Sequence, residues 1–162
     1  MAQVLDRVKL FLDTNVLLDI LVKREGTVYA AAILEAARRS QVELVTTTQS
    51  FLDAAYIMRS AAHREKYNKF LSWMLNNTNV EYLDTFDLKE GADSGGADLE
   101  DEAQVAHAIS SACDYFITSD KELLKKDIPG MAFVTPKDLV DRMKAAGASE
   151  REAPAALVKS DV

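Results

Sequence analysis

Five aspartates in this chain occupy positions where carboxylates can act together in chemistry. Asp13 and Asp120 each follow a short apolar segment of strand-forming residues. Asp98 and Asp101 lie at the start of a segment with helical periodicity, and Asp53 lies early in another such segment. Because the carboxyl ends of parallel strands share one edge of a sheet, we expect these side chains to meet there.

A group of carboxylates brought together in this way calls for a cation. Two carboxylates ~5 Å apart repel each other by about 3 kcal/mol at an effective dielectric of ~20, and a divalent ion removes that repulsion. Oxygen ligands without a nearby His or Cys favour Mg²⁺ or Mn²⁺ over Zn²⁺. Such ions bind phosphate oxygens and activate water, so the pattern indicates phosphodiester or phosphoryl hydrolysis.

Each of these acids also has a purely structural interpretation. Asp13 (or Thr14), Asp98 and Asp120 all precede helical segments, where a side-chain oxygen caps the first turn and the helix dipole favours a negative charge. Asp53 pairs with Ser50 at capping-box spacing. Capping explains each position singly, but it does not require distant acids to share one edge of a sheet.

The elements that must position these acids alternate along the chain. Strands are predicted at residues 8–12, 42–46, 80–83, 115–118 and 132–134. Helices are predicted from residues 14, 26 and 50 onward and over residues 67–74, 99–109, 121–126 and 136–144. The alternation predicts an α/β fold with three α/β/α layers and a mainly parallel central sheet.

Two segments fall outside this alternation. Residues 84–97 contain three of the six glycines and are predicted to form a flexible loop. Residues 145–162 are polar and alanine-rich without a clear period, which predicts a disordered or partner-docking tail. The domain organisation expected is therefore one catalytic domain over residues 1–144, followed by this tail.

Composition excludes several protein classes. The chain has 162 residues, a net charge of −7 and one cysteine, so a disulfide framework is excluded and a cytoplasmic location is expected. Nothing approaches the roughly 18 apolar residues of a membrane span. An acidic chain is a poor general nucleic-acid binder, but one basic segment offers candidate RNA contacts: Arg59, Arg64, Lys66 and Lys69.

Three motifs of the chain together resemble those of one known protein family. Leu10-Phe11-Leu12-Asp13-Thr14-Asn15-Val16-Leu17-Leu18-Asp19 resembles the opening of the PIN-domain ribonucleases. Asp98-Leu99-Glu100-Asp101 resembles the third acidic motif of that family, and Phe116-Ile117-Thr118-Ser119-Asp120 resembles its strand-then-acid ending. The order and intervals fit over roughly residues 8–140.

The resemblance implies a small α/β fold whose acidic pocket binds Mg²⁺ or Mn²⁺ and hydrolyses RNA. Many bacterial members, the VapC-like proteins, are the toxins of toxin–antitoxin pairs, act as homodimers and are inhibited by an antitoxin protein. By position, the resemblance assigns metal binding to Asp13, Asp101 and Asp120, with Asp98 as an accessory acid. It assigns the orientation of these acids or of the attacking water to Thr14, Asn15 and Thr118.

One departure from the family pattern leaves an alternative open. The second acid of the family is usually Glu, whereas Asp53 stands at that position and is shorter by one methylene group. The alternative is therefore a catalytically weakened module that binds RNA or protein. A phosphatase of the haloacid dehalogenase class is less favoured, because Asn15 stands where that class needs a second acid.

Overall fold

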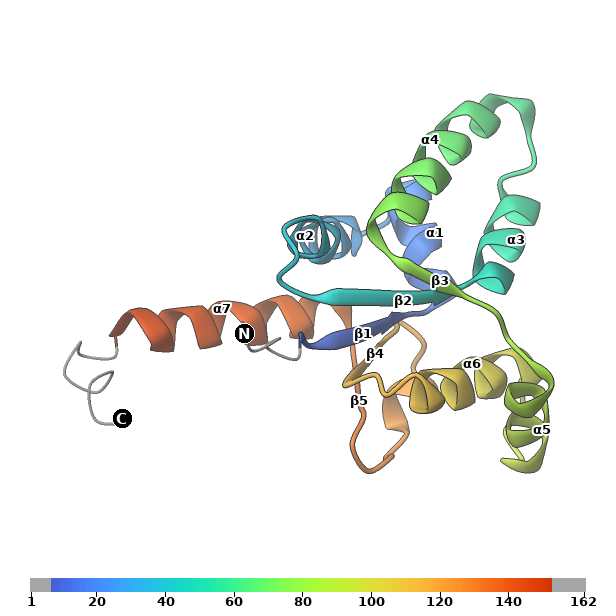
Figure 1. Ribbon diagram of the computed structural model, residues 1–162. Coiled ribbons are helices and arrows are strands. Elements are labelled where there is room, and N and C mark those ends of the chain that lie inside the picture. Colours follow the sequence, from blue (N-terminus) through green and yellow to red (C-terminus); the bar gives the residue numbers. More distant parts are fainter. Residues whose placement is uncertain (1–6, 153–162) are drawn as a thin grey trace, which may run out of the picture.

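Five parallel strands form a single sheet at the centre of the computed structural model, which describes residues 7–152 (Figure 1). The strands are β1 (Lys9–Leu12), β2 (Glu43–Thr47), β3 (Asn79–Glu81), β4 (Tyr115–Ile117) and β5 (Ala132–Val134). Their order in the sheet is β3-β2-β1-β4-β5, and every pairing is parallel. The predicted three-layer α/β fold is confirmed, with a sheet that is parallel throughout.

Helices cover both faces of this sheet. The helices are α1 (Thr14–Val22), α2 (Thr27–Arg38), α3 (Thr48–Ile57), α4 (Ala61–Asn77), α5 (Thr85–Asp93), α6 (Leu99–Ser110), the short 3₁₀ helix η1 (Leu123–Lys125) and α7 (Pro136–Glu152). Helices α1 to α4 lie on one side of the sheet in Figure 1, and α5 and α6 lie on the other. None of the helices in the described part of the chain could span a membrane.

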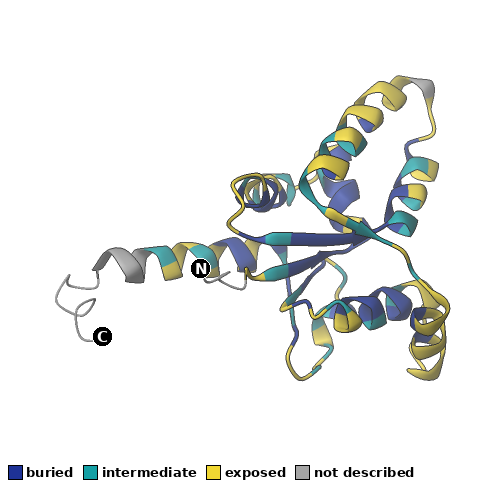
Figure 2. Cartoon of the chain, viewed as in Figure 1, coloured by how far each residue is buried: buried dark blue, intermediate teal, exposed yellow. Residues whose placement is uncertain are grey.

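The core packs against both faces of the sheet because strand residues alternate between them. Leu10 and Leu12 of β1 pack among α1, α2 and α7. Phe11 points to the opposite face, where its ring stacks on Phe116 with centroids 4.9 Å apart. Figure 2 shows both faces of the central strands buried, so the strands read as continuous apolar runs.

The position of β1 in the middle of the sheet determines where the acids can meet. Phe11 lies opposite Val45 of β2 on one side and Phe116 of β4 on the other. The chain therefore leaves three neighbouring strands at the same edge, with Asp13 following β1 and Thr118 following β4.

The glycine-rich segment is largely helical, so the prediction of a flexible loop over residues 84–97 is wrong. Asp84 and Asp87 form a reciprocal capping box that starts α5. A Cβ added at Gly91 would lie 2.7 Å from the backbone nitrogen of Ala103, so glycine there allows α5 to approach α6 closely. Figure 2 shows how exposed α5 remains on its other sides.

A histidine between two carboxylates also fastens this segment. Nδ1 of His107 on α6 lies 2.7 Å from Oδ2 of Asp87, and Nε2 lies 2.8 Å from Oε2 of Glu81 at the end of β3. Ser111 donates a further hydrogen bond of 2.7 Å to the same Glu81 oxygen. Charge-assisted bonds of this kind are about twice as strong as neutral ones, so they hold α5 and β3 against α6.

Helix α7 is longer than its periodicity predicts. It continues eight residues past Lys144 to Glu152 and extends away from the sheet in Figure 1. Residues 145–152 of the predicted tail are therefore helical, and residues 153–162 lie outside the described residues. The domain boundary at residue 144 and the docking role of the tail stay predictions.

Candidate functional site

Asp13 lies at the centre of the edge where the strands end. It is 2% exposed, and its Oδ2 accepts a 2.7 Å hydrogen bond from Oγ1 of Thr118, which is fully buried. Asp13 occupies the N-cap position of α1, but its side chain makes no capping hydrogen bond. Burial raises the pKa of Asp13, and the hydrogen bond from Thr118 partly opposes that rise. Thr118 therefore binds one carboxylate oxygen of Asp13, and the orienting role implied for it stays a prediction.

Thr118 links a second acid to the first. Its Oγ1 also accepts a 3.0 Å hydrogen bond from the backbone N–H of Asp120. Oδ1 of Asp120 accepts hydrogen bonds from the backbone N–H groups of Glu122 at 2.7 Å and Leu123 at 3.0 Å. Asp120 thus caps the turn that leads into η1 while its backbone is fixed next to Asp13.

Asp98 and Asp101 bring the start of α6 to the same edge. Oδ1 of Asp98 caps the helix by accepting from the backbone N–H groups of Glu100 at 2.9 Å and Asp101 at 3.3 Å. The pKa of Asp101 is raised to about 6, first by burial and then by the charges of Asp13, Asp98 and Asp120. The structure therefore brings these four aspartates into one electrostatic group, the acidic cluster (Asp13, Asp98, Asp101 and Asp120).

Asp53 lies beside a carboxylate that the sequence analysis did not select. Its Oδ1 accepts a 2.9 Å hydrogen bond from Nε2 of Gln49, while its Oδ2 is buried without a hydrogen-bond partner in the described structure. Partial burial, first of all, raises the pKa of Glu100. The neighbouring carboxylate of Asp53 and then the charges of Asp98 and Asp101 raise this pKa further, to about 7. Glu100 thus connects Asp53 to the acidic cluster.

Thr14 contacts this group through neutral side chains. Its Oγ1 donates a 2.9 Å hydrogen bond to Oγ of Ser50 and accepts one of 3.3 Å from Nε2 of Gln104. Nε2 of Gln104 donates a second bond of 2.9 Å to Oε1 of Glu100. Asn15, by contrast, is exposed. The orienting roles implied for Thr14 and Asn15 stay predictions, since the hydrogen bonds of Thr14 go to Ser50 and Gln104.

The sequence contains one signal that points to Glu100 and Gln104. Residues four apart share a helix face, so a helix starting at Leu99 places these two side chains together. The sequence does not tell which face of α6 meets α1, and Thr14 lies 90 residues from Gln104. The partner of this pair therefore becomes visible only in the fold.

The donor set fits a hard divalent cation in its chemistry and its charge. Among the side chains that the structure describes, no three His, Cys, Asp or Glu residues already surround a metal position. Burial, and after it the charges of neighbouring acids, nevertheless raise the pKa values of Asp13 and Asp101. This is an electrostatic cost that a bound cation removes. Their oxygens are the ligands that Mg²⁺ and Mn²⁺ prefer.

The predicted RNA-contact residues differ in how they are engaged. Arg59 stacks over the ring of Tyr56, with its guanidinium carbon 4.5 Å from the ring centroid. Lys66 donates a hydrogen bond to the backbone carbonyl of Leu21 at the end of α1. Lys69 forms an ion pair with its neighbour one turn earlier, and Arg64 is exposed on α4. RNA contact by this segment stays a prediction.

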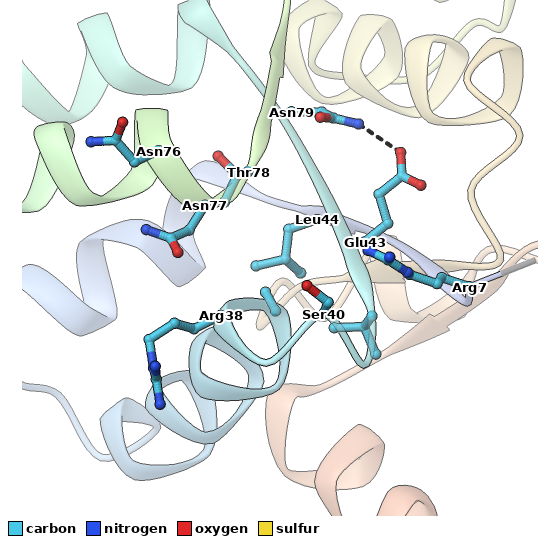
Figure 3. Close-up of a pocket in the computed structure, with 11 residues that line it drawn as sticks. Arg7, Arg38, Ser40, Glu43, Leu44, Asn76, Asn77, Thr78 and Asn79 are labelled. Carbon is cyan, nitrogen blue, oxygen red and sulfur yellow. Dashed lines mark hydrogen bonds between the residues drawn. The ribbon is translucent and has the colours of Figure 1, made fainter. Parts of the chain in front are cut away.

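A polar cavity lies at the opposite edge of the sheet, where the strands begin. It has a volume of about 380 Å³, and Figure 3 shows the asparagines that face it from the end of α4 and from β3. The side-chain amides of Asn76 and Asn77 donate to backbone carbonyls one turn earlier in α4, and that of Asn79 donates to Glu43. These donors therefore terminate a helix and brace a strand, far from the acidic cluster.

Comparison with known proteins supports one family. The sequence model of the PIN domain matches residues 9–122. No curated protein sequence matches the chain.

Three solved structures share the fold at low sequence identity. VapBC2 from Rickettsia felis, bound to a promoter DNA fragment, matches with a TM-score of 0.59 and 14% identity over 78% of this chain and 98% of its own. A toxin–antitoxin complex from Klebsiella pneumoniae matches with a TM-score of 0.59 and 19% identity over 78% and 96%. VapC20 of Mycobacterium tuberculosis, a sarcin–ricin-loop-cleaving toxin, matches with a TM-score of 0.56 and 11% identity over 70% and 91%.

Proposed function

The chain belongs to the PIN-domain family, and from that premise we propose that it is a divalent-metal-dependent ribonuclease. The observation that carries the proposal is the acidic cluster, in which burial and the charges of Asp13, Asp98 and Asp120 raise the pKa of Asp101 to about 6. Carboxylates held together at such an electrostatic cost are suited to binding a cation that meets a phosphodiester.

In this proposal the cation is Mg²⁺ or Mn²⁺, held by Asp13, Asp101 and Asp120 with Asp98 as accessory acid. When bound, it supplies Lewis acidity and lowers the pKa of a water molecule. Thr118 fixes the carboxylate of Asp13 through its hydroxyl hydrogen bond. Burial of Asp13 limits competing water at this edge, so the carboxylate is already desolvated when substrate arrives.

The reaction proposed is hydrolysis by in-line attack of water at phosphorus. The new P–O bond forms as the P–O3′ bond breaks. The attacking water releases one proton to solvent, and the leaving 3′ oxygen takes one from solvent. The products are a 3′-hydroxyl and a 5′-phosphate. Asp53, held by Gln49, is the fourth acid of the proposed site, and Arg59, Arg64, Lys66 and Lys69 are its proposed contacts to the RNA backbone.

We extend the proposal to the biological setting of the enzyme. Two of the similar structures are VapBC or toxin–antitoxin complexes, which supports a toxin inhibited by an antitoxin protein. The proposal also places this toxin in the cytoplasm as a homodimer. The predicted tail over residues 145–162 is a candidate docking segment for that partner.

One alternative keeps a specific observation in its favour. A weakened RNA- or protein-binding module fits the side chain of Asp53, which is one methylene group shorter than the Glu usual at this position. The phosphatase alternative loses its support, because the PIN-domain match covers residues 9–122 and includes all the predicted acids.

The experiment that tests the proposal incubates labelled transfer RNA, ribosomal RNA fragments and single-stranded RNA with the full chain. Parallel reactions contain Mn²⁺, Mg²⁺ or a chelator. We expect cleavage that needs the metal and falls at least ~10²-fold in Asp101→Asn, because that substitution removes a charge facing the transition state. Asp141→Asn, an exposed carboxylate on α7, serves as the matched control and keeps full activity.

Two other results are informative. Cleavage that survives in Asp101→Asn contradicts the proposed site. RNA binding without cleavage, in a chain that binds Mn²⁺ weakly, favours the module instead.

A further inference from the structure

Gln104 is an unusual residue for its position. Its side chain is 1% exposed, although glutamine is rarely buried so completely. Nε2 makes two hydrogen bonds, whereas Oε1 is buried without a partner among the described residues. A buried amide that is only half satisfied contributes little net stability. An apolar side chain of the same size would fill the space at least as well, so the contacts of Nε2 need another explanation.

One of these contacts is a fixed anchor. Gln104 donates at 3.3 Å to Oγ1 of Thr14, which in turn donates at 2.9 Å to Oγ of Ser50. Ser50 is fully buried and lies 3.1 Å from Oγ1 of Thr47, the N-cap of α3. This chain of buried hydroxyls joins α1 to α3, so the Gln104 amide has a defined direction.

The other contact holds a carboxylate among like charges. Gln104 donates at 2.9 Å to Oε1 of Glu100, which lies at the surface. Glu100 lies between Asp98 and Asp101 in the first turn of α6, so its carboxylate has like charges on both sides. An untethered glutamate would turn into water to escape this repulsion. The hydrogen bond from Gln104 keeps it in place.

We propose that Glu100 contributes a further carboxylate to the cation held by the acidic cluster, and that Gln104 is the positioning residue that holds Glu100 toward it. This inference rests on the proposed function. The unpartnered Oδ2 of Asp53, buried beside Glu100, is a second observation that points to a cation at this place. Residues that hydrogen-bond a metal-ligating carboxylate typically change metal affinity 10–100-fold when they are replaced.

The test measures Mn²⁺ binding to the full chain by calorimetry, without RNA. Gln104→Met keeps the side-chain volume and removes both hydrogen bonds, and Glu100→Ala removes the carboxylate. We expect each variant to bind Mn²⁺ about ten-fold more weakly. The double variant should be no weaker than the weaker single variant, because Gln104 acts through Glu100. Gln41→Met, at the opposite edge of the sheet, should bind like the wild type.

A kinetic measurement separates positioning from a merely structural role. In Gln104→Met we expect kcat for RNA cleavage to fall at limiting Mn²⁺ while KM for RNA stays unchanged, and excess Mn²⁺ should restore the rate. A purely structural role would lower the melting temperature and leave the Mn²⁺ affinity of the folded protein unaltered. If Gln104→Met does not fold, Glu100→Ala and Glu100→Gln, at an exposed position, carry the test of the carboxylate.

The outcomes distinguish this inference from the proposed function. A wild-type chain that binds Mn²⁺ and cleaves RNA, together with unchanged affinity in the folded Gln104→Met and Glu100→Ala variants, overturns the inference alone. Additive losses in the double variant overturn the action of Gln104 through Glu100. A wild-type chain that binds no Mn²⁺ overturns the proposed function and this inference together.

Discussion

A single hydroxyl group serves two acids at the end of the central strands. Oγ1 of Thr118 donates to Asp13 at 2.7 Å and accepts from the backbone of Asp120 at 3.0 Å. Thr118 is fully buried and Asp13 nearly so. Water therefore cannot readily replace the hydroxyl, and the loss of one donor leaves a buried carboxylate oxygen without its partner.

The substitution Thr118→Val tests this arrangement, because valine has the same shape and no hydroxyl. We expect the free energy of unfolding at pH 7 to fall by about 1–3 kcal/mol, and the pKa of Asp13 to rise further because the hydrogen bond that lowers it is lost. Urea denaturation measures the first effect. Thr85→Val, at an exposed position, is the control. Equal stability of Thr118→Val and the wild type would contradict the inference that the Thr118 hydroxyl stabilises the buried carboxylate of Asp13.

At the scale of elements, the contact between α5 and α6 depends on one glycine. A Cβ at Gly91 would lie 2.7 Å from the backbone nitrogen of Ala103, and backbone cannot move aside as a flexible side chain can. We expect Gly91→Ala to destabilise the protein by about 1–3 kcal/mol. Gly147→Ala on α7, where nothing lies within 4 Å, should instead stabilise it by up to about 1 kcal/mol. Thermal unfolding of both variants measures these changes in stability. A Gly91→Ala variant as stable as the wild type would show that α5 and α6 can move apart.

This helix also shows where sequence reasoning ended. The loop prediction rests on the three glycines of residues 84–97 and does not use Asp84 and Asp87, whose spacing is a capping signal. Glycine is ambiguous in a sequence, because it marks both loops and close packing. The packing reason appears only when Ala103 is found opposite Gly91.

The sheet and the meeting of the acids were easier to predict. The apolar strands alternate with helices, and parallel strands place their carboxyl ends together, so the approach of Asp13, Asp101 and Asp120 follows from local patterns and one topological rule. The hydrogen bond between Gln104 and Thr14 does not follow from them. It depends on the rotation of α6 about its axis, which packing against the whole sheet determines.

At the scale of the whole molecule, the burial of the site's carboxylates and their mutual repulsion make stability depend on pH. Without divalent cations, the folded chain raises the pKa of Glu100 from 4.5 to about 7 and that of Asp101 from 3.8 to about 6. At pH values between the unfolded and the folded pKa of each group, Glu100 and Asp101 bind more protons in the folded state than in the unfolded state. The contribution of both groups to the free energy of unfolding is therefore greatest at low pH and decreases as pH rises from about 4 to 7.

Chemical denaturation in the presence of a chelator at pH 4.5, 6 and 7.5 measures how the free energy of unfolding changes with pH. We expect this change to be smaller in Asp101→Asn than in the wild type. Saturating Mn²⁺ at pH 7.5 should raise the stability of the wild type, because the ion binds the folded state alone. The opposite result would be a free energy of unfolding that falls more steeply with pH in Asp101→Asn than in the wild type. It would show that the folded chain does not raise the pKa values of these carboxylates.

The hydrogen bond between Asp13 and Thr118 joins residues that are 105 positions apart, and this separation has a consequence during translation. A ribosome adds about 5–20 residues each second, so roughly 5–20 s pass between the synthesis of the two residues. Throughout that time a nascent chain carries Asp13 without its orienting partner and without β4 beside β1. The proposed ribonuclease would thus be made in an inactive state, and the ribosome that synthesises it would not be exposed to the completed site until most of the chain has been made.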